Sequence, residues 1–125
     1  MLVAEDNGLN RFLLQKVLET LGARNVSFAV DGNEVVDMAR TADTPFDVIF
    51  MDIQMPVADG LTAARRLRES GVTTPIAALT AHAMEKDREK CLEAGMEYYL
   101  SKPYKIADLQ GVLDDVRRRA DREAA

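Results

Sequence analysis

The amino-acid sequence predicts an α/β fold, with a single five-stranded parallel sheet covered by helices on both faces. Short apolar segments, each about the length of one strand, alternate along the chain with longer segments whose apolar residues recur every three or four positions. Glycine, proline and aspartate separate the two kinds of segment. Alternation of this kind favours parallel strands joined by right-handed crossovers, and so a doubly wound (βα)5 domain.

Each predicted strand is an apolar segment that ends at polar or turn-forming residues. The five segments are Leu2–Ala4, Val26–Val30, Val48–Met51, Ile76–Thr80 and Tyr98–Leu100. Asp52 stands directly after the third segment, and Pro56 and Gly60 then prevent a regular continuation. An apolar strand without alternation is typical of a parallel strand that is buried on both faces.

Each predicted helix follows one of these strands and carries one apolar stripe. The first helix runs from Asn10 to Gly22, and the second opens at a capping box of Asp31 and Glu34. The third follows Gly60 and ends at Ser70, and the fourth spans Met84 to Ala94. The apolar stripe of the last helix consists of Ile106, Leu109, Val112, Leu113 and Val116. We expect residues 1–125 to form one domain, whose polar end, Arg119 to Ala125, frays.

The composition restricts the class of protein. No apolar segment approaches the roughly 18 to 20 residues of a transmembrane helix. The N-terminal residues lack a basic region followed by an apolar core, so we expect no signal peptide. The single cysteine, Cys91, cannot form an internal disulfide, which favours a reducing compartment. We therefore expect a cytoplasmic domain without membrane contact of its own, although a parent protein could be membrane-anchored.

The charge balance argues against direct binding to nucleic acid. The net charge is −5, whereas binding to phosphates depends on a basic surface. Two clusters of arginines, Arg65 to Arg68 and Arg117 to Arg119, interrupt this acidic background. We interpret both clusters as solvated helix faces; the alternative is that they bind an acidic surface of a partner.

Polar side chains stand at the carboxyl ends of four predicted strands. Glu5 and Asp6 follow the first strand, Asp52 follows the third, Thr80 ends the fourth, and Lys102 comes shortly after the fifth. Ligands bind beyond the carboxyl ends of parallel strands, so we expect these side chains to share one crevice. Three carboxylates there repel each other without a cation, and oxygen ligands suit Mg²⁺. No cluster of cysteine and histidine suggests zinc.

This set of side chains suits phosphoryl transfer. An aspartate can itself be the nucleophile and form an aspartyl-phosphate, a role that Asp52 could fill. Lys102 would then pair with one phosphoryl oxygen, while the Thr80 hydroxyl donates to another. Taken singly, each residue also has an ordinary structural interpretation, as a turn residue, a strand residue or a surface lysine.

Four segments, in this order, carry a resemblance to a known family. They are Leu2–Asn7, Met51–Pro56 with Asp59-Gly60, Leu79–Ala81 and Leu100–Pro103. Over its whole length the chain resembles the receiver (response-regulator) domain of two-component signalling, whose fold is flavodoxin-like (CheY-like). Within that family, Val3–Asn7 and Leu79–Met84 most resemble the receivers of hybrid histidine kinases.

The resemblance implies roles for the site residues. Asp52 would accept a phosphoryl group from a phosphohistidine. Mg²⁺ (or Mn²⁺) would be bound by Asp6, Asp52 and the main-chain carbonyl of Gln54, with Glu5 acting through water. Gln54 and His82, each two residues after a site residue, would tune the rate of dephosphorylation.

The resemblance also implies a switch and partners. Phosphorylation adds negative charge and strong acceptor oxygens. Thr80 would move toward the phosphoryl group, and Tyr99 would turn inward behind it, repacking the surface of the fourth helix, fifth strand and fifth helix. The bond between Lys102 and Pro103 would be cis. The partners would be a histidine kinase, a histidine phosphotransfer domain, or both, with homodimerisation possible through the repacked face.

The resemblance leaves two kinds of parent protein open. The chain would catalyse only its own phosphorylation and dephosphorylation, whereas a parent hybrid protein would be a histidine kinase that passes the phosphoryl group to a phosphotransfer protein.

Two other classes fit less well. A phosphatase of the haloacid dehalogenase type needs a second aspartate two residues after the nucleophile, where this chain has Gln54. A flavin-mononucleotide protein needs a phosphate-binding loop after the first strand, where the chain has Glu5 and Asp6. No glycine-rich nucleotide-binding pattern occurs.

Overall fold

The computed structural model describes residues 1–23, 25–43, 46–53, 59–80, 85–101 and 105–124. The elements follow the order β1 (Leu2–Ala4), α1 (Gly8–Thr20), β2 (Ser27–Ala29), α2 (Gly32–Thr41), β3 (Ile49–Asp52), α3 (Gly60–Glu69), β4 (Ile76–Thr80), α4 (Glu85–Glu93), β5 (Tyr98–Ser101) and α5 (Ile106–Ala124). All strand pairs are parallel, in the order β2-β1-β3-β4-β5. The predicted fold class is confirmed.

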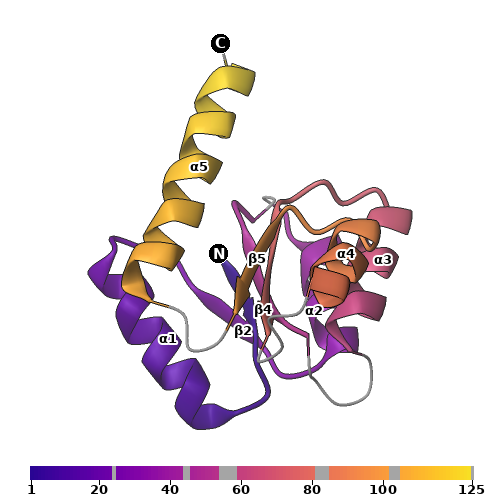
Figure 1. Cartoon of the computed structure of the whole chain (residues 1–125), viewed down its shortest axis with the longest axis horizontal. Helices are drawn as coiled ribbons and strands as arrows, with labels where there is room; N and C mark the ends of the chain where they lie inside the picture. Colours follow the sequence, from indigo (N-terminus) through magenta and orange to yellow (C-terminus); the bar gives the residue numbers. More distant parts are fainter. Residues whose placement is uncertain (24, 44–45, 54–58, 81–84, 102–104, 125) are drawn as a thin grey trace.

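The helices cover both faces of the sheet. Figure 1 shows α1 and α5 on one side and α2, α3 and α4 on the other. Because side chains alternate along a strand, successive residues of β3 enter different layers: Phe50 packs with the α1 and α5 layer, and Met51 packs with the α2 to α4 layer. Both side chains are fully buried. This double burial explains why β3 reads as a continuous apolar run.

Side chains of Asn7, Asp31 and Asp59 cap the beginnings of α1, α2 and α3. Asp31 caps α2 by accepting a hydrogen bond from the main-chain N–H of Glu34 at 2.8 Å, as the capping-box spacing predicts. Asn7 caps α1 in the same way, through the N–H of Asn10 at 3.0 Å. The helix α1 therefore begins at Gly8, two residues before the predicted start, and its first turn lies directly after the acidic residues that follow β1.

One residue of the last helix departs from the predicted apolar stripe. Leu109, Val112, Leu113 and Val116 are buried as the stripe predicts, but Ile106 is 52% exposed. Ile106 is the first residue of α5 and lies outside the buried cluster that the later turns join. At its other end the helix continues through Ala124.

The interpretation of Arg68 as part of a solvated helix face is wrong. Its guanidinium donates to the main-chain oxygens of Val72, Thr74 and Gly95 at 2.8 to 3.0 Å, and to the carboxylate of Glu97 at 2.7 Å. The other carboxylate oxygen of Glu97 accepts from the N–H of Ile76. Arg68 thus joins α3 to the segments that lead into β4 and β5.

Tyr98 connects β5 to α5 and gives a prediction for alkaline pH. Its hydroxyl donates to the Asp115 carboxylate at 2.5 Å, and the Arg119 guanidinium lies over its ring. Burial and the hydrogen bond to Asp115 raise the pKa of Tyr98 to about 12. A raised pKa means that the neutral hydroxyl stabilises the fold below about pH 10, and that this contribution is lost as the pH rises toward 12.

We therefore expect the Tyr98→Phe variant to lose less stability than the wild type between pH 10 and pH 12. Urea midpoints of both proteins, measured at several pH values in that range, give the comparison. Parallel curves for the two proteins would show that Tyr98 does not contribute to the alkaline loss.

Candidate functional site

Three carboxylates converge at the carboxyl ends of β1 and β3. The two strands are neighbours, and Ala4 pairs with Met51, so the next residues, Glu5 and Asp52, lie side by side. Glu5 and Asp52 are 1% and 3% exposed, whereas Asp6 is exposed. One carboxylate oxygen from each of the three residues lies within 4.8 Å of the others. The three acids therefore lie close together, as expected from the strand ends.

Local hydrogen bonds shape the turn that carries two of these acids. The N–H of Glu5 donates to the carbonyl of Ala29 at 3.0 Å, and one oxygen of the Glu5 carboxylate accepts from the N–H of Asn7 at 3.2 Å. The Arg11 guanidinium donates to the main-chain oxygen of Glu5 at 2.9 Å. The turn is thus held by one hydrogen bond to the neighbouring strand, one within the turn and one from the first helix, α1.

The three carboxylates suit a hard divalent cation. Oxygen ligands on opposite sides of an octahedral Mg²⁺ are about 4.2 Å apart, because each Mg–O distance is about 2.1 Å. The oxygens of the three acids lie within 4.8 Å of one another, which is close to this spacing, so the three residues could hold one ion between them. The exposed position of Asp6 leaves room for the waters that Mg²⁺ retains, and a cation offsets the repulsion of the acids.

Thr80 lies on the strand beside the one that carries Asp52, and its side chain is connected to Tyr99 on the next strand. Thr80 ends β4, the neighbour of β3, and is 2% exposed. Tyr99 lies on β5 and packs against the α2 to α4 layer. Burial, with the nearby charges of Asp87 and Cys91, raises the pKa of Tyr99, while a side-chain hydrogen bond with Thr80 lowers it. The hydroxyl of Thr80 therefore links the site to β5.

The other predicted site residues fall outside the described residues. These are Lys102, Gln54 and His82, together with the predicted cis bond to Pro103. Ser101, which directly precedes Lys102, ends β5 and pairs with Thr80 in the register of the sheet. The strand that leads to Lys102 thus ends level with the strand that carries Thr80.

Gly60 has a packing role that the sequence did not reveal. The sequence indicated a residue that ends the turn after the third strand and that, with Asp59, carries part of the family resemblance. In the structure it begins α3 against the main chain that follows β3: a Cβ atom there would lie 2.6 Å from the carbonyl oxygen of Asp52 and 2.9 Å from the Cα of Ile53. Its N–H also donates to the carbonyl of Ile53 at 3.0 Å. Only glycine permits this approach without a backbone shift.

We expect Gly60→Ala to destabilise the fold by about 1 to 3 kcal/mol, the range for overpacking a close contact. Gly111→Ala is the matched control, because no atom lies within 4 Å of a Cβ at that exposed position in α5, where alanine should be neutral or stabilising. Urea unfolding measures both changes. Equal effects of the two substitutions would contradict the role assigned to Gly60.

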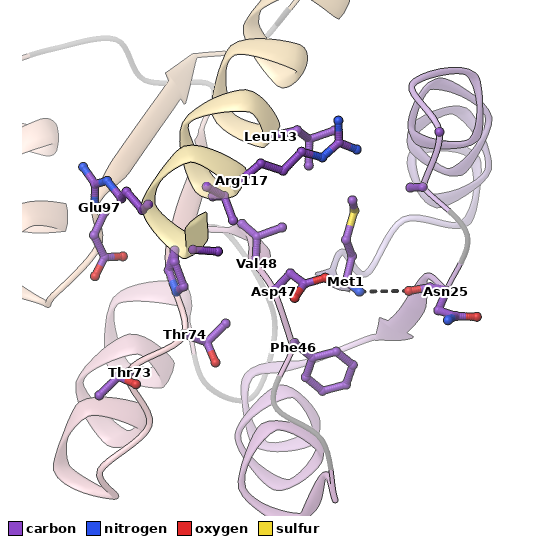
Figure 2. A pocket seen from close by; sticks show the side chains of 16 residues that line it. Met1, Asn25, Phe46, Asp47, Val48, Thr73, Thr74, Glu97, Leu113 and Arg117 are labelled. Atoms are coloured by element: carbon purple, nitrogen blue, oxygen red, sulfur yellow. Dashed lines mark hydrogen bonds between the residues drawn. The ribbon is translucent and has the colours of Figure 1, made fainter. Parts of the chain in front are cut away.

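A separate cavity lies at the amino ends of the strands, opposite the carboxyl ends that carry the acids. Its volume is about 710 Å³, and its lining includes Met1, Val48, Pro75 and Glu97, which flank the amino ends of strands (Figure 2). The terminal amino group of Met1 donates there to the carbonyl of Asn25 at 2.8 Å. None of the described site residues lines this cavity. The carboxylates and the cavity are therefore distinct features of the molecule.

Comparison with known proteins identifies the family. The model of the response regulator receiver domain matches residues 1–114. The chain belongs to this family. It is a receiver domain of two-component signalling, as the four segments predicted.

Relatives of the receiver domain include parts of histidine kinases. It is 39% identical over 119 residues to the osmosensing histidine protein kinase SLN1 of Saccharomyces cerevisiae, covering 92% of this chain and 10% of that protein. Hybrid signal transduction histidine kinases of Dictyostelium discoideum also match, at 33% to 42% identity. The predicted similarity to receivers of hybrid kinases is confirmed, and the chain spans only a small part of these proteins.

Solved structures agree with this assignment. The receiver domain of the sensor histidine kinase PA1611 from Pseudomonas aeruginosa PAO1, which has a magnesium ion in its active-site cleft, is 44% identical with a TM-score of 0.80, covering 91% of this chain and 93% of that one. The co-crystal structure of the Saccharomyces cerevisiae phosphotransfer protein Ypd1 with the receiver domain of Ssk1 matches at 31% identity and a TM-score of 0.77, covering 86% and 81%.

Among the described residues, no helix combines the length and the apolar character that are needed to cross a membrane.

Proposed function

We propose that this receiver domain is the phosphoacceptor of a phosphorelay and that Asp52 takes the phosphoryl group from a phosphohistidine. The convergence of Asp52 with Glu5 and Asp6 at adjacent strand ends carries this proposal. Asp52 ends a strand buried on both faces, which holds its carboxylate on a rigid element. Thr80 ends the neighbouring strand, so a hydroxyl stands on the other side of Asp52 from the acids.

In the proposed step, one carboxylate oxygen of Asp52 attacks the phosphorus of the phosphohistidine. The new bond is P–O, the P–N bond breaks, and the imidazole nitrogen leaves with the electron pair and then takes up a proton. Thr80 donates to one phosphoryl oxygen and Lys102 pairs with another. Catalysis of this kind depends on positioning and on neutralising the phosphoryl oxygens.

We propose that Asp6, Asp52 and the main-chain carbonyl of Gln54 hold Mg²⁺ or Mn²⁺, with Glu5 acting through water. When bound, the ion neutralises charge on the acids and on the phosphoryl oxygens. The burial of Glu5 and its hydrogen bond from Asn7 suit an indirect role, whereas the exposed Asp6 can reach an ion directly. The magnesium in the related receiver of Pseudomonas aeruginosa supports this assignment.

The proposed readout begins at Thr80. Its side-chain hydrogen bond with Tyr99 gives the phosphoryl group a route to β5 and, through the contacts of Tyr99, to α4. The face of α4, β5 and α5 would then repack and could also support a homodimer. Gln54 and His82 remain proposed modifiers of the dephosphorylation rate.

The proposed partners are a histidine kinase and a histidine phosphotransfer domain in the cytoplasm. Similarity to kinase receivers favours a parent hybrid kinase that passes the phosphoryl group to a phosphotransfer protein. The complex of a related receiver with Ypd1 supports such a partner. In this proposal the domain catalyses only its own phosphorylation and dephosphorylation.

The test is incubation of the chain with a small phosphodonor, such as phosphoramidate, and Mg²⁺. We expect one acid-labile phosphoryl group per chain by intact mass, mapped to Asp52 after borohydride reduction of the aspartyl-phosphate. Chelation of the metal should prevent the modification. A phosphoryl group on another residue, or one that forms equally well with the metal chelated, would overturn the proposal.

A further inference from the structure

One arginine of α1 is bound to the turn that carries the acidic residues. The Arg11 guanidinium folds back along the helix, and its Nη1 donates to the main-chain oxygen of Glu5 at 2.9 Å in a partly buried position. Its other terminal nitrogen lies 3.5 Å from where a Cβ of Gly8 would be. The arginine side chain therefore lies across the glycine that begins α1.

The acceptor of this hydrogen bond, the main-chain carbonyl of Glu5, determines what the bond restrains. The carbonyl of Glu5 belongs to the planar peptide unit that links Glu5 to Asp6. Fixing this oxygen fixes the plane of that peptide, and with it the direction in which the Asp6 side chain leaves the main chain. Asp6 is exposed, so packing does not hold it in place as it holds Glu5 and Asp52. The hydrogen bond from Arg11 is then one of the restraints on the peptide that carries the exposed Asp6 carboxylate.

We propose that Arg11 is a positioning residue for metal binding: it holds the peptide between Glu5 and Asp6 so that the Asp6 carboxylate faces Asp52 despite their mutual repulsion. This inference rests on the proposed function, since it concerns the metal-dependent reaction of the same site. A hydrogen bond from a charged donor is stronger than one between neutral groups, which suits a restraint that must oppose like charges.

The direction of the effect separates positioning from simple charge. Arg11 is positive, so removing its charge without any other change would strengthen the binding of a cation nearby. Loss of positioning acts in the opposite direction, because Asp6 then has to be ordered when the ion binds. Residues that orient metal ligands typically change metal affinity by about 10- to 100-fold, and we expect Arg11 to lie near the lower limit.

The experiment compares four versions of the chain: the wild type, Arg11→Met, Arg11→Lys and Lys16→Met. Lys16 lies on the same helix, is exposed and contacts the Phe12 ring and Glu19, so its substitution removes the same charge without touching the turn. Mg²⁺ affinity is measured by calorimetry and Mn²⁺ affinity by electron paramagnetic resonance. The rate of phosphorylation by phosphoramidate is measured as a function of Mg²⁺ concentration.

We expect Arg11→Met to weaken metal binding about tenfold, with a rate that recovers at saturating Mg²⁺. Arg11→Lys, which keeps the charge and one donor, should recover most of the affinity, and Lys16→Met should match the wild type. Unchanged or tighter metal binding by Arg11→Met would overturn the inference. If that variant does not fold, Arg11→Gln provides the same comparison. A wild type that binds Mg²⁺ but accepts no phosphoryl group would refute the proposed function. The role of Arg11 would then be decided by the measured metal affinities alone.

Discussion

Asp52→Asn is expected to abolish phosphorylation by small phosphodonors, with a loss of at least about 100-fold, because an amide oxygen cannot replace a carboxylate as the nucleophile. The substitution keeps the size of the side chain at a position that is 3% exposed. It also removes one of three negative charges that lie close together. The variant should therefore fold at least as well as the wild type without metal. Intact mass after incubation with phosphoramidate and Mg²⁺ measures the loss.

The matched control is Asp37→Asn, the same chemical change on the exposed side of α2. This variant should be phosphorylated at the wild-type rate. Phosphorylation that persists at the wild-type level in Asp52→Asn would place the acceptor elsewhere and refute the mechanism.

Asp6→Asn and Lys102→Ala are expected to separate metal binding from phosphoryl binding. Asp6 is one of the three converging carboxylates, and loss of its charge should weaken Mg²⁺ binding by about 10- to 100-fold. Lys102 is proposed to meet the phosphoryl group, so Lys102→Ala should retain Mg²⁺ affinity close to that of the wild type. Calorimetric titration with Mg²⁺ measures both affinities.

The second half of this prediction concerns signalling. Lys102→Ala should bind the ion and still fail to pass on a signal, because the phosphoryl group lacks its cationic partner. The failure would be seen as an unchanged surface of α4, β5 and α5 in hydrogen exchange after addition of phosphodonor. A loss of Mg²⁺ affinity in Lys102→Ala as large as that in Asp6→Asn would show that the two roles are assigned incorrectly.

The fold could be predicted from the sequence because its strands are buried on both faces. Ile76–Thr80 was predicted with its observed limits, and the segment around Phe50 needed only a shift of one residue. The acidic crevice followed from topology alone: once the strands are parallel, residues at their carboxyl ends share one edge. The structure shows this proximity for Glu5, Asp6 and Asp52.

Features that depend on a long-range approach could not be predicted in this way. The contact of Gly60 with the main chain of Asp52 depends on how α3 packs against β3, and a glycine after a turn gives no sign of it. Arg68 stood in an arginine-rich run typical of a solvated helix, yet its partners lie up to 29 positions away. The hydrogen bond of Arg11 could not be predicted either, because its acceptor is a main-chain oxygen, which every residue carries.

The two adjacent tyrosines of β5 have a consequence for how a signal would leave the domain. Tyr98 faces α5, where it is bound to Asp115, and Tyr99 faces the opposite layer, where it meets Thr80 and α4. One strand therefore carries the attachment points of both neighbouring helices at consecutive positions. In the proposed readout, a displacement of β5 would reach both layers at once, so a partner that contacts either helix alone would respond to phosphorylation.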